Sequence, residues 1–297
     1  MSDAVHEPVV EITSPVVVVD APPRRPLIAR PRELALRALP LLGLLAVWWA
    51  LTTFMFDRPR IYPPPLDVWD EVVRILSGDG PLGSTYAHAG ATLYRLAVSF
   101  VLAFVLGTLG GIAAGRQKWF FDFTDNLVWI AMTVPSVVWV FIFVIAIGIS
   151  NVVPILALIV LLTPPVFIAV AEGAKAVPQQ LTTMARSYHV GPWQRLTGVY
   201  LPSVIPYMAG SARVTFALGI KIVIIAEVVG LPTGIGLLIK YWSDTLYMAP
   251  VVAWGLLLTA GGVAIDLLVF KPIERRATRY VTGSATASTT PSVTTQG

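Results

Sequence analysis

Five charged side chains fall in or near the long apolar stretches of this sequence, and they are the first candidates for chemistry. They are Arg95, Arg213, Lys221, Glu227 and Asp266. A charge near the centre of a bilayer costs about 2.5–3.5 kcal/mol on insertion scales, so such side chains usually face protein or water. Arg95 and Glu227 are expected near the outer ends of their helices, within reach of the interface, and Asp266 near an inner end. We interpret these three as structural, with Glu227 also kept as a candidate for a substrate path.

Arg213 and Lys221 are expected deeper in the membrane than the other three. They are eight residues apart, which is about 80° around a helix, so one broad face can hold both. Two buried cations without an adjacent acid would suit a negatively charged small molecule. The alternatives are structural: Arg213 would pair with backbone carbonyls or a helix C-terminus, and Lys221 with an acid on a neighbouring helix.

Other kinds of chemistry lack the residues they need. The sequence contains no cysteine, which excludes disulfides, thiolate nucleophiles and cysteine-based metal sites. Its three histidines, His6, His88 and His189, lie far apart and show no ligand spacing. None of the five lysines follows a glycine, so there is no phosphate-binding loop for a nucleotide. We expect no catalytic residue, no metal and no cofactor in this chain.

Composition predicts that the elements carrying these charges are membrane helices. The chain is 56% hydrophobic and 13% charged, whereas soluble domains carry about 25% charged residues. Its apolar runs approach ~20 residues, the length that crosses ~30 Å of hydrocarbon, and backbone polar groups in lipid must bond within the segment. The net charge of +4 is typical of basic loops on one side of a membrane rather than of a nucleic-acid-binding protein.

The sequence therefore predicts an all-α membrane protein with about six transmembrane helices between residues 35 and 280. The spans are expected at residues 35–56, 91–115, 126–149, 152–171, 204–230 and 248–270. Residues 1–34 and 281–297 are expected to be disordered tails. The first tail is not expected to be a signal peptide, because it begins acidic and lacks a basic-then-apolar order.

The distribution of basic residues predicts the orientation. The two ends of the chain, residues 1–34 and 271–297, and the loops 116–125 and 172–203 hold thirteen lysines and arginines, whereas the loops 57–90 and 231–247 hold four. By the positive-inside rule, both termini and the 172–203 segment are expected in the cytoplasm.

Glycine and proline positions predict how the spans pack. Gly107, Gly111 and Gly115 recur every four residues and share one helix face, where another backbone can approach closely. That face could serve packing within the chain or a contact between subunits. The prolines are expected to bend the third and fourth spans; they are Pro135, Pro154, Pro164 and Pro165.

The polar segment 172–203 is too long for a structureless loop and is expected to form two short helices. Pro178 can open the first, which would run to about Tyr188. Gly191-Pro192 would break it and open a second helix, which Leu201-Pro202 would end before the fifth span begins. Two such helices could form a protrusion that fits a partner's groove; the alternative is an ordinary amphipathic connector.

Several motifs resemble one known family. The runs Ala185-Arg186-Ser187, Trp193-Gln194 and Val199-Tyr200-Leu201-Pro202 resemble the EAA loop of binding-protein-dependent ABC transporter permeases, especially the nitrate, sulfonate and taurine branch. The resemblance extends over about residues 60–270. It includes Pro63-Pro64-Pro65, Thr92-Leu93-Tyr94-Arg95, Pro135-Ser136, Arg213 and Ala226-Glu227-Val228-Val229-Gly230.

The loop also departs from the family pattern. Without gaps, the family's Glu-Ala-Ala falls on Thr183-Met184-Ala185 and its glycine falls on His189, while the nearest glycine is Gly191. The resemblance assigns ATPase coupling to this loop, and its residues are Ala185, Arg186, Ser187, His189, Gly191, Pro192, Trp193, Leu201 and Pro202.

The resemblance implies the permease subunit of an importer in a bacterial plasma (inner) membrane. Two permease copies would form the path, separate ATPase subunits would bind ATP and magnesium, and an extracytoplasmic binding protein would deliver the solute. The branch implies a small anion such as nitrate, bicarbonate, a sulfonate (including taurine) or an aromatic carboxylate. The alternatives are a secondary transporter or channel that works alone, for which no convincing internal repeat is found, and a membrane enzyme, for which no catalytic cluster is found.

Overall fold

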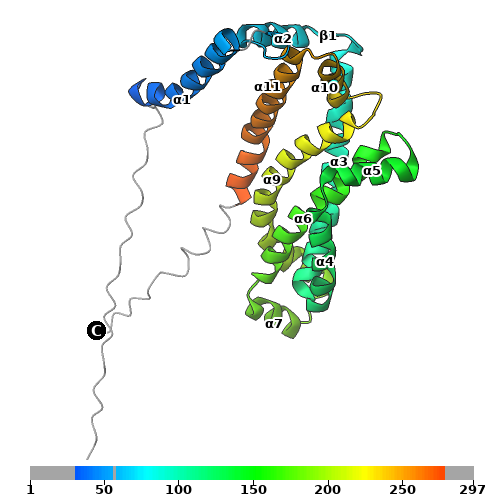
Figure 1. Ribbon diagram of the computed structural model, residues 1–297. Coiled ribbons are helices and arrows are strands. Elements are labelled where there is room, and N and C mark those ends of the chain that lie inside the picture. The colour runs from blue at the N-terminus through cyan, green and yellow to red at the C-terminus, as the bar shows by residue number, and fades with distance from the viewer. Residues whose placement is uncertain (1–30, 56–57, 278–297) are drawn as a thin grey trace, which may run out of the picture. The chain divides into compact units, whose positions relative to one another are not determined.

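The computed structural model describes residues 31–55 and 58–277 (Figure 1). The chain divides into two units, residues 1–47 and 48–297, which are described separately. The elements are α1 Pro31–Ala50, the π-helix Leu51–Met55, α2 Pro65–Ser77, β1 Asp79–Gly80, β2 Gly83–Ser84, α3 Thr85–Arg116, α4 Lys118–Thr133, α5 Ser136–Ile147, α6 Val152–Lys175, α7 Gln179–Ser187, α8 Pro192–Arg195, the π-helix Leu196–Tyr200, α9 Leu201–Val228, α10 Ile235–Asp244, α11 Met248–Ile265 and the π-helix Asp266–Phe270.

In the first unit, helix α1 begins at Pro31, inside the 1–34 segment that the sequence predicts to be unstructured. Proline suits the first turn of a helix because its missing N–H has no partner there in any case. Residues 1–30 of the expected N-terminal tail, and the expected C-terminal tail 281–297, lie outside the described residues.

In the second unit, α3, α6 and α9 lie side by side (Figure 1). One cluster of buried side chains joins the three helices: Leu96 and Ala103 from α3, Leu158 and Leu162 from α6, and Val223 from α9. Where water would otherwise reach these side chains, their burial stabilises the packing by ~25 cal/mol per Å² of apolar surface. Where the helices are surrounded by lipid, the stabilisation comes mainly from close van der Waals packing.

The glycine face of α3 is occupied by α6 of the same chain. A Cβ atom added at Gly107 would lie 2.7 Å from the Cβ atom of Val166, and one at Gly111 would lie 2.7 Å from the carbonyl oxygen of Phe167. A Cβ atom at Gly115 would overlap Ala174. Packing within the chain therefore accounts for the four-residue spacing, and the glycines let two backbones approach.

The third expected span is not one straight helix. Helices α4 and α5 meet at an angle of 96° across a short break, which Val134 and Pro135 form. Proline lacks a donor and disfavours a helical residue before it, so a sharp bend is expected at this position. Helix α6, by contrast, continues through Pro164 and Pro165.

By length and composition, four helices among the described residues could each cross a membrane. They are Thr85–Arg116, Val152–Lys175, Pro192–Val228 and Met248–Ala277, and the bent pair α4–α5 would make a fifth. The first expected span, 35–56, corresponds to the shorter apolar helix Leu42–Met55.

The fifth span begins earlier than the sequence predicts. Its helix runs without interruption from Pro192 to Val228, so the break expected at Leu201-Pro202 is wrong. A π-turn explains the continuity: the N–H group of Leu201 bonds to the carbonyl of Leu196, five residues back. The widened turn accommodates Pro202, which has no N–H group to donate to a helical hydrogen bond.

At the far end of the bundle from α7, the amphipathic helix α2 packs on α10 and α11 (Figure 1). Its Val68, Val72 and Ile75, which share one face of the helix, are buried against Leu238 and Trp254. The short β1–β2 hairpin, in which Asp79 pairs with Ser84, connects α2 to α3.

Candidate functional site

A groove of about 910 Å³ lies between α9 and α11. Its walls are mostly apolar side chains, including Ile220, Ile224 and Leu258. Four ionisable residues also line it, and these are Arg213, Lys221, Asp266 and Glu274. Arg213 and Lys221 thus face one groove, as their spacing on the helix predicts.

Arg213 does have acidic partners, so the expectation of a cation without an adjacent acid is wrong for this residue. Its Nε and Nη2 atoms donate to the two carboxylate oxygens of Asp266 at 2.6 and 2.7 Å. Nη1 also donates to Glu274 at 3.0 Å. This bidentate geometry is the strongest that a guanidinium and a carboxylate can form. Arg213 therefore connects α9 to the end of the last span rather than offering a free positive charge.

Lys221 differs from Arg213. Its side chain is exposed in the isolated chain and lines the groove beside isoleucines. Among the described residues it has no ion pair with any carboxylate. The alternative of an acidic partner on a neighbouring helix therefore has no support within this part of the chain. Lys221 is therefore a cation that lines a mostly apolar groove and has no ion-pair partner among the described residues.

Glu227 lies inside the bundle rather than in the groove. Its carboxylate accepts a hydrogen bond from Nη1 of Arg95 at 2.6 Å, and the two side chains are 0% and 2% exposed. The hydroxyl of Thr92 and the N–H group of Gly236 also donate to this carboxylate, each at 2.9 Å. The expectation that Arg95 and Glu227 reach the interface is therefore wrong, because both side chains are buried and the loop between α9 and α10, residues 229–234, packs against them.

Further polar groups in this buried cluster accept hydrogen bonds from Arg95. Its guanidinium donates to the carbonyl oxygen of Thr233 at 2.8 Å and to the side chain of Asn151 at 2.5 Å. The backbone N–H of Gly234 donates to Nδ1 of His88 at 3.1 Å. Gly234 has a φ of +124°, a left-handed conformation that favours glycine. We name Arg95, Glu227 and these partners the buried ion-pair cluster; it ties α3, α6 and α9 to the loop before α10.

Sequence reasoning missed most of this cluster, although one signal was present. Polar residues recur at His88, Thr92, Arg95 and Ser99, which are the i, i+4, i+7 and i+11 positions of one helix face. All four side chains are buried. A polar stripe inside an apolar helix must be satisfied within the protein, since lipid offers no hydrogen-bond partner.

The 172–203 segment forms the expected first helix. Helix α7 begins after Pro178 and ends before Tyr188, and Gly191 precedes Pro192 at the start of α8. Large apolar side chains point outward from this segment, since Tyr188 is 77% and Trp193 is 72% exposed. Of the residues assigned to coupling, Ala185 is buried and Gly191 is half-buried, while the others are exposed.

The backbone angles of this segment show which of its residues adopts a conformation that favours glycine. Gly191 has a φ of −59°, which any residue can adopt, so glycine is not required there. His189 instead has a φ of +50°, the left-handed conformation in which glycine is favoured. The family's loop glycine falls on His189 without gaps, so the backbone retains the turn although the side chain differs.

Comparison with known proteins independently supports the resemblance to binding-protein-dependent permeases. The family model for the binding-protein-dependent transport system inner membrane component matches residues 107–279, more than half of the chain. The taurine transport system permease protein TauC of Escherichia coli (strain K12) is 26% identical over 250 residues, covering 84% of this chain and 90% of that protein. The bicarbonate transport system permease protein CmpB of Synechococcus elongatus is 25% identical, over 77% of this chain and 84% of that protein. The nitrate import permease protein NrtB of Leptolyngbya laminosa is 25% identical, over 66% and 71%.

Solved structures show the same fold. A chain of the MetNI methionine ABC transporter, in an inward-facing conformation, aligns with a TM-score of 0.51 at 17% identity and covers 75% of this chain and 99% of its own. An amino acid ABC transporter also aligns with a TM-score of 0.51, at 16% identity, covering 71% and 97%. With this fold and the match to the family model, the chain belongs to the family of binding-protein-dependent transport system inner membrane components and is the permease subunit of an ABC importer.

Proposed function

We propose that the α9–α11 groove is this subunit's side of the path for a small anion, and that Lys221 is the cation that meets the anion there. The observation that carries this proposal is a lysine in a mostly apolar groove that forms no ion pair with any carboxylate in the described part of the chain. An anion that leaves water for apolar surroundings loses hydration, and a nearby positive charge offsets part of that cost. A single exposed lysine would also bind weakly enough to release the solute.

The relatives support the chemical class of the solute. They are named for taurine, nitrate and bicarbonate. Each of these molecules carries a small, negatively charged group of oxygens at neutral pH, which a lysine ammonium can attract without a fixed geometry.

In this proposal Arg213 does not bind the solute. Because Asp266 and Glu274 neutralise its charge, it fixes the inner part of the groove by joining α9 to the end of the last span. Glu227 is likewise a structural residue, since its carboxylate is fully occupied inside the buried ion-pair cluster.

The path needs partners that this chain does not contain. We propose that a second copy of the chain faces the open side of the groove and that an extracytoplasmic binding protein delivers the solute. Separate ATPase subunits, which bind ATP and magnesium, would dock on the 172–203 segment, with both chain termini on the same cytoplasmic side. The exposed Tyr188 and Trp193 support a docking surface, since aromatic side chains are enriched at protein interfaces. Native mass spectrometry that finds one copy beside a different permease would refute the homodimer.

Uptake by the reconstituted complex tests the role of Lys221. Lys221→Met should reduce the transport rate at least about tenfold, because the charge that offsets anion dehydration is removed, and Lys221→Arg should retain part of the rate. The control is Lys240→Met, since Lys240 lies outside the groove and pairs with Asp244. Basal ATPase activity and the thermal midpoint of Lys221→Met should stay unchanged. Normal uptake by Lys221→Met at normal expression would refute the proposal, and a loss of stability would indicate a structural role.

A further inference from the structure

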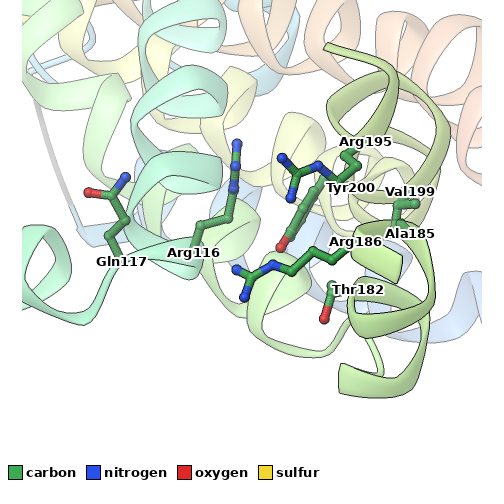
Figure 2. A pocket seen from close by; sticks show the side chains of 8 residues that line it. All are labelled: Arg116, Gln117, Thr182, Ala185, Arg186, Arg195, Val199 and Tyr200. Carbon is green, nitrogen blue, oxygen red and sulfur yellow. The ribbon is translucent and has the colours of Figure 1, made fainter. Parts of the chain in front are cut away.

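A second cavity lies between the end of α3 and the 172–203 segment, well apart from the groove. It has a volume of about 150 Å³ and is shown in Figure 2. Three arginines from three different elements line it: Arg116 at the end of α3, Arg186 on α7 and Arg195 on α8. We name these residues the arginine pocket. Gln117 and Tyr200 add neutral polar groups to the same walls.

No carboxylate lines the arginine pocket. Within the described chain none of its three guanidinium groups belongs to an ion pair. Arg116 lies over the ring of Tyr200, with 5.0 Å from its Cζ atom to the ring centroid. The Nε atom of Arg195 is buried and has no hydrogen-bond partner. A buried donor without an acceptor is costly and rare in folded proteins, so this atom indicates a missing ligand.

The arrangement matches one kind of ligand. Guanidinium groups bind the oxygens of phosphate and sulfate through paired hydrogen bonds, and converging arginines repel one another unless an anion lies between them. A cavity of 150 Å³ holds about five water molecules at ~30 Å³ each, which leaves room for a five-atom oxyanion. We propose that the arginine pocket binds a phosphate-sized oxyanion, and that this anion joins the end of α3 to the 172–203 segment.

The oxyanion could come from free inorganic phosphate or from the phosphate of a lipid headgroup, because both offer the same oxygens. The binding is separate from transport through the groove, since the two cavities share no residue. Its expected effect is on stability: a ligand that binds only the folded chain raises the thermal midpoint of that chain.

The first test measures the thermal midpoint of the purified full chain in a phosphate-free detergent, with inorganic phosphate or chloride at equal ionic strength. Phosphate should raise the midpoint by about 3 °C. Arg195→Gln and Arg186→Gln should each abolish most of this shift. The control is Lys118→Gln, because Lys118 is an exposed cation next to the pocket that does not line it; this variant should respond like the unmodified chain.

A parallel test adds phosphatidic acid or phosphatidylcholine to the detergent. A shift with phosphatidic acid alone, lost in Arg195→Gln, would identify a lipid headgroup as the source. The proposal is overturned if neither oxyanion source shifts the midpoint, as expected if the pocket instead receives a carboxylate of the ATPase. Equal phosphate shifts in the unmodified chain and in both arginine variants would also overturn it.

Discussion

The buried ion-pair cluster predicts a large loss of stability when Arg95 is replaced by Met. The substitution keeps a long side chain but leaves the carboxylate of Glu227 with only Thr92 and Gly236 as donors. Both charged side chains are almost completely buried, at 2% and 0% exposed. Removing one partner of a buried pair leaves an uncompensated charge, which costs about 3–5 kcal/mol. We therefore expect Arg95→Met to lower the thermal midpoint by roughly 10 °C.

Replacing the acid should also lower the thermal midpoint, because Glu227→Gln leaves the buried guanidinium of Arg95 without its counter-ion. In Glu227→Gln the amide oxygen can still accept from Gly236, and Arg95 keeps its bonds to Asn151 and Thr233. A chain carrying Arg95→Met and Glu227→Gln together should lose less stability than the sum of the two single losses, with a coupling free energy of about 1–3 kcal/mol.

Tryptophan fluorescence during heating of the purified chain in detergent measures both effects. The matched control is Arg74→Met, because Arg74 also pairs with a glutamate but is 46% exposed, while its partner Glu71 is 9% exposed; a pair with one solvent-exposed partner should cost less to break than a fully buried pair. Equal midpoints for Arg95→Met and Arg74→Met, or a double variant that is merely additive, would refute the reasoning that this pair holds the helices together.

Three further predictions concern the backbone; two use the same thermal measurement, and Gly191→Val is measured by coupled transport. His189→Gly should raise stability by about 0.5–1 kcal/mol, because glycine adopts a φ of +50° without strain; Gly191→Val should preserve coupled transport, and its loss would show that glycine is needed at that position. Gly111→Ala should lower stability by about 1–3 kcal/mol, since the new Cβ atom would lie 2.7 Å from the carbonyl oxygen of Phe167 and overpacking strains the helix pair. Gly261→Ala is its control, with nothing within 4 Å of the added atom, and equal midpoints for the two variants would contradict the close approach of α3 and α6.

Local patterns in the sequence predict the parts of this fold that local chemistry determines. Apolar runs predict membrane helices, Pro178 predicts the start of α7, and Pro135 predicts a bend. The shared groove of Arg213 and Lys221 is also local, because both residues lie on one helix. Their positions follow from 3.6 residues per turn alone.

The pairing of charges could not be predicted in the same way. Arg95 and Glu227 are 132 residues apart, and Arg213 and Asp266 are 53 apart. Which cation meets which acid depends on how the helices pack, and no periodicity within one helix contains that information. The continuity through Pro202 was missed for a different reason: proline usually ends a helix, and the π-turn that accommodates it has no clear sequence signature.

The uninterrupted helix from Pro192 to Val228 has a mechanical consequence. Its 37 residues span about 55 Å at ~1.5 Å each. The helix can therefore move as one rigid body with α8 at one end. A tilt of about 10° pivoted at one end moves the other end by about 10 Å over that length. Helix α7, in contrast, is joined to α8 through a short non-helical linker and is not part of this continuous helix. A displacement of α8 would therefore be carried along the helix to Lys221, whereas α7 is connected to that helix only through the linker.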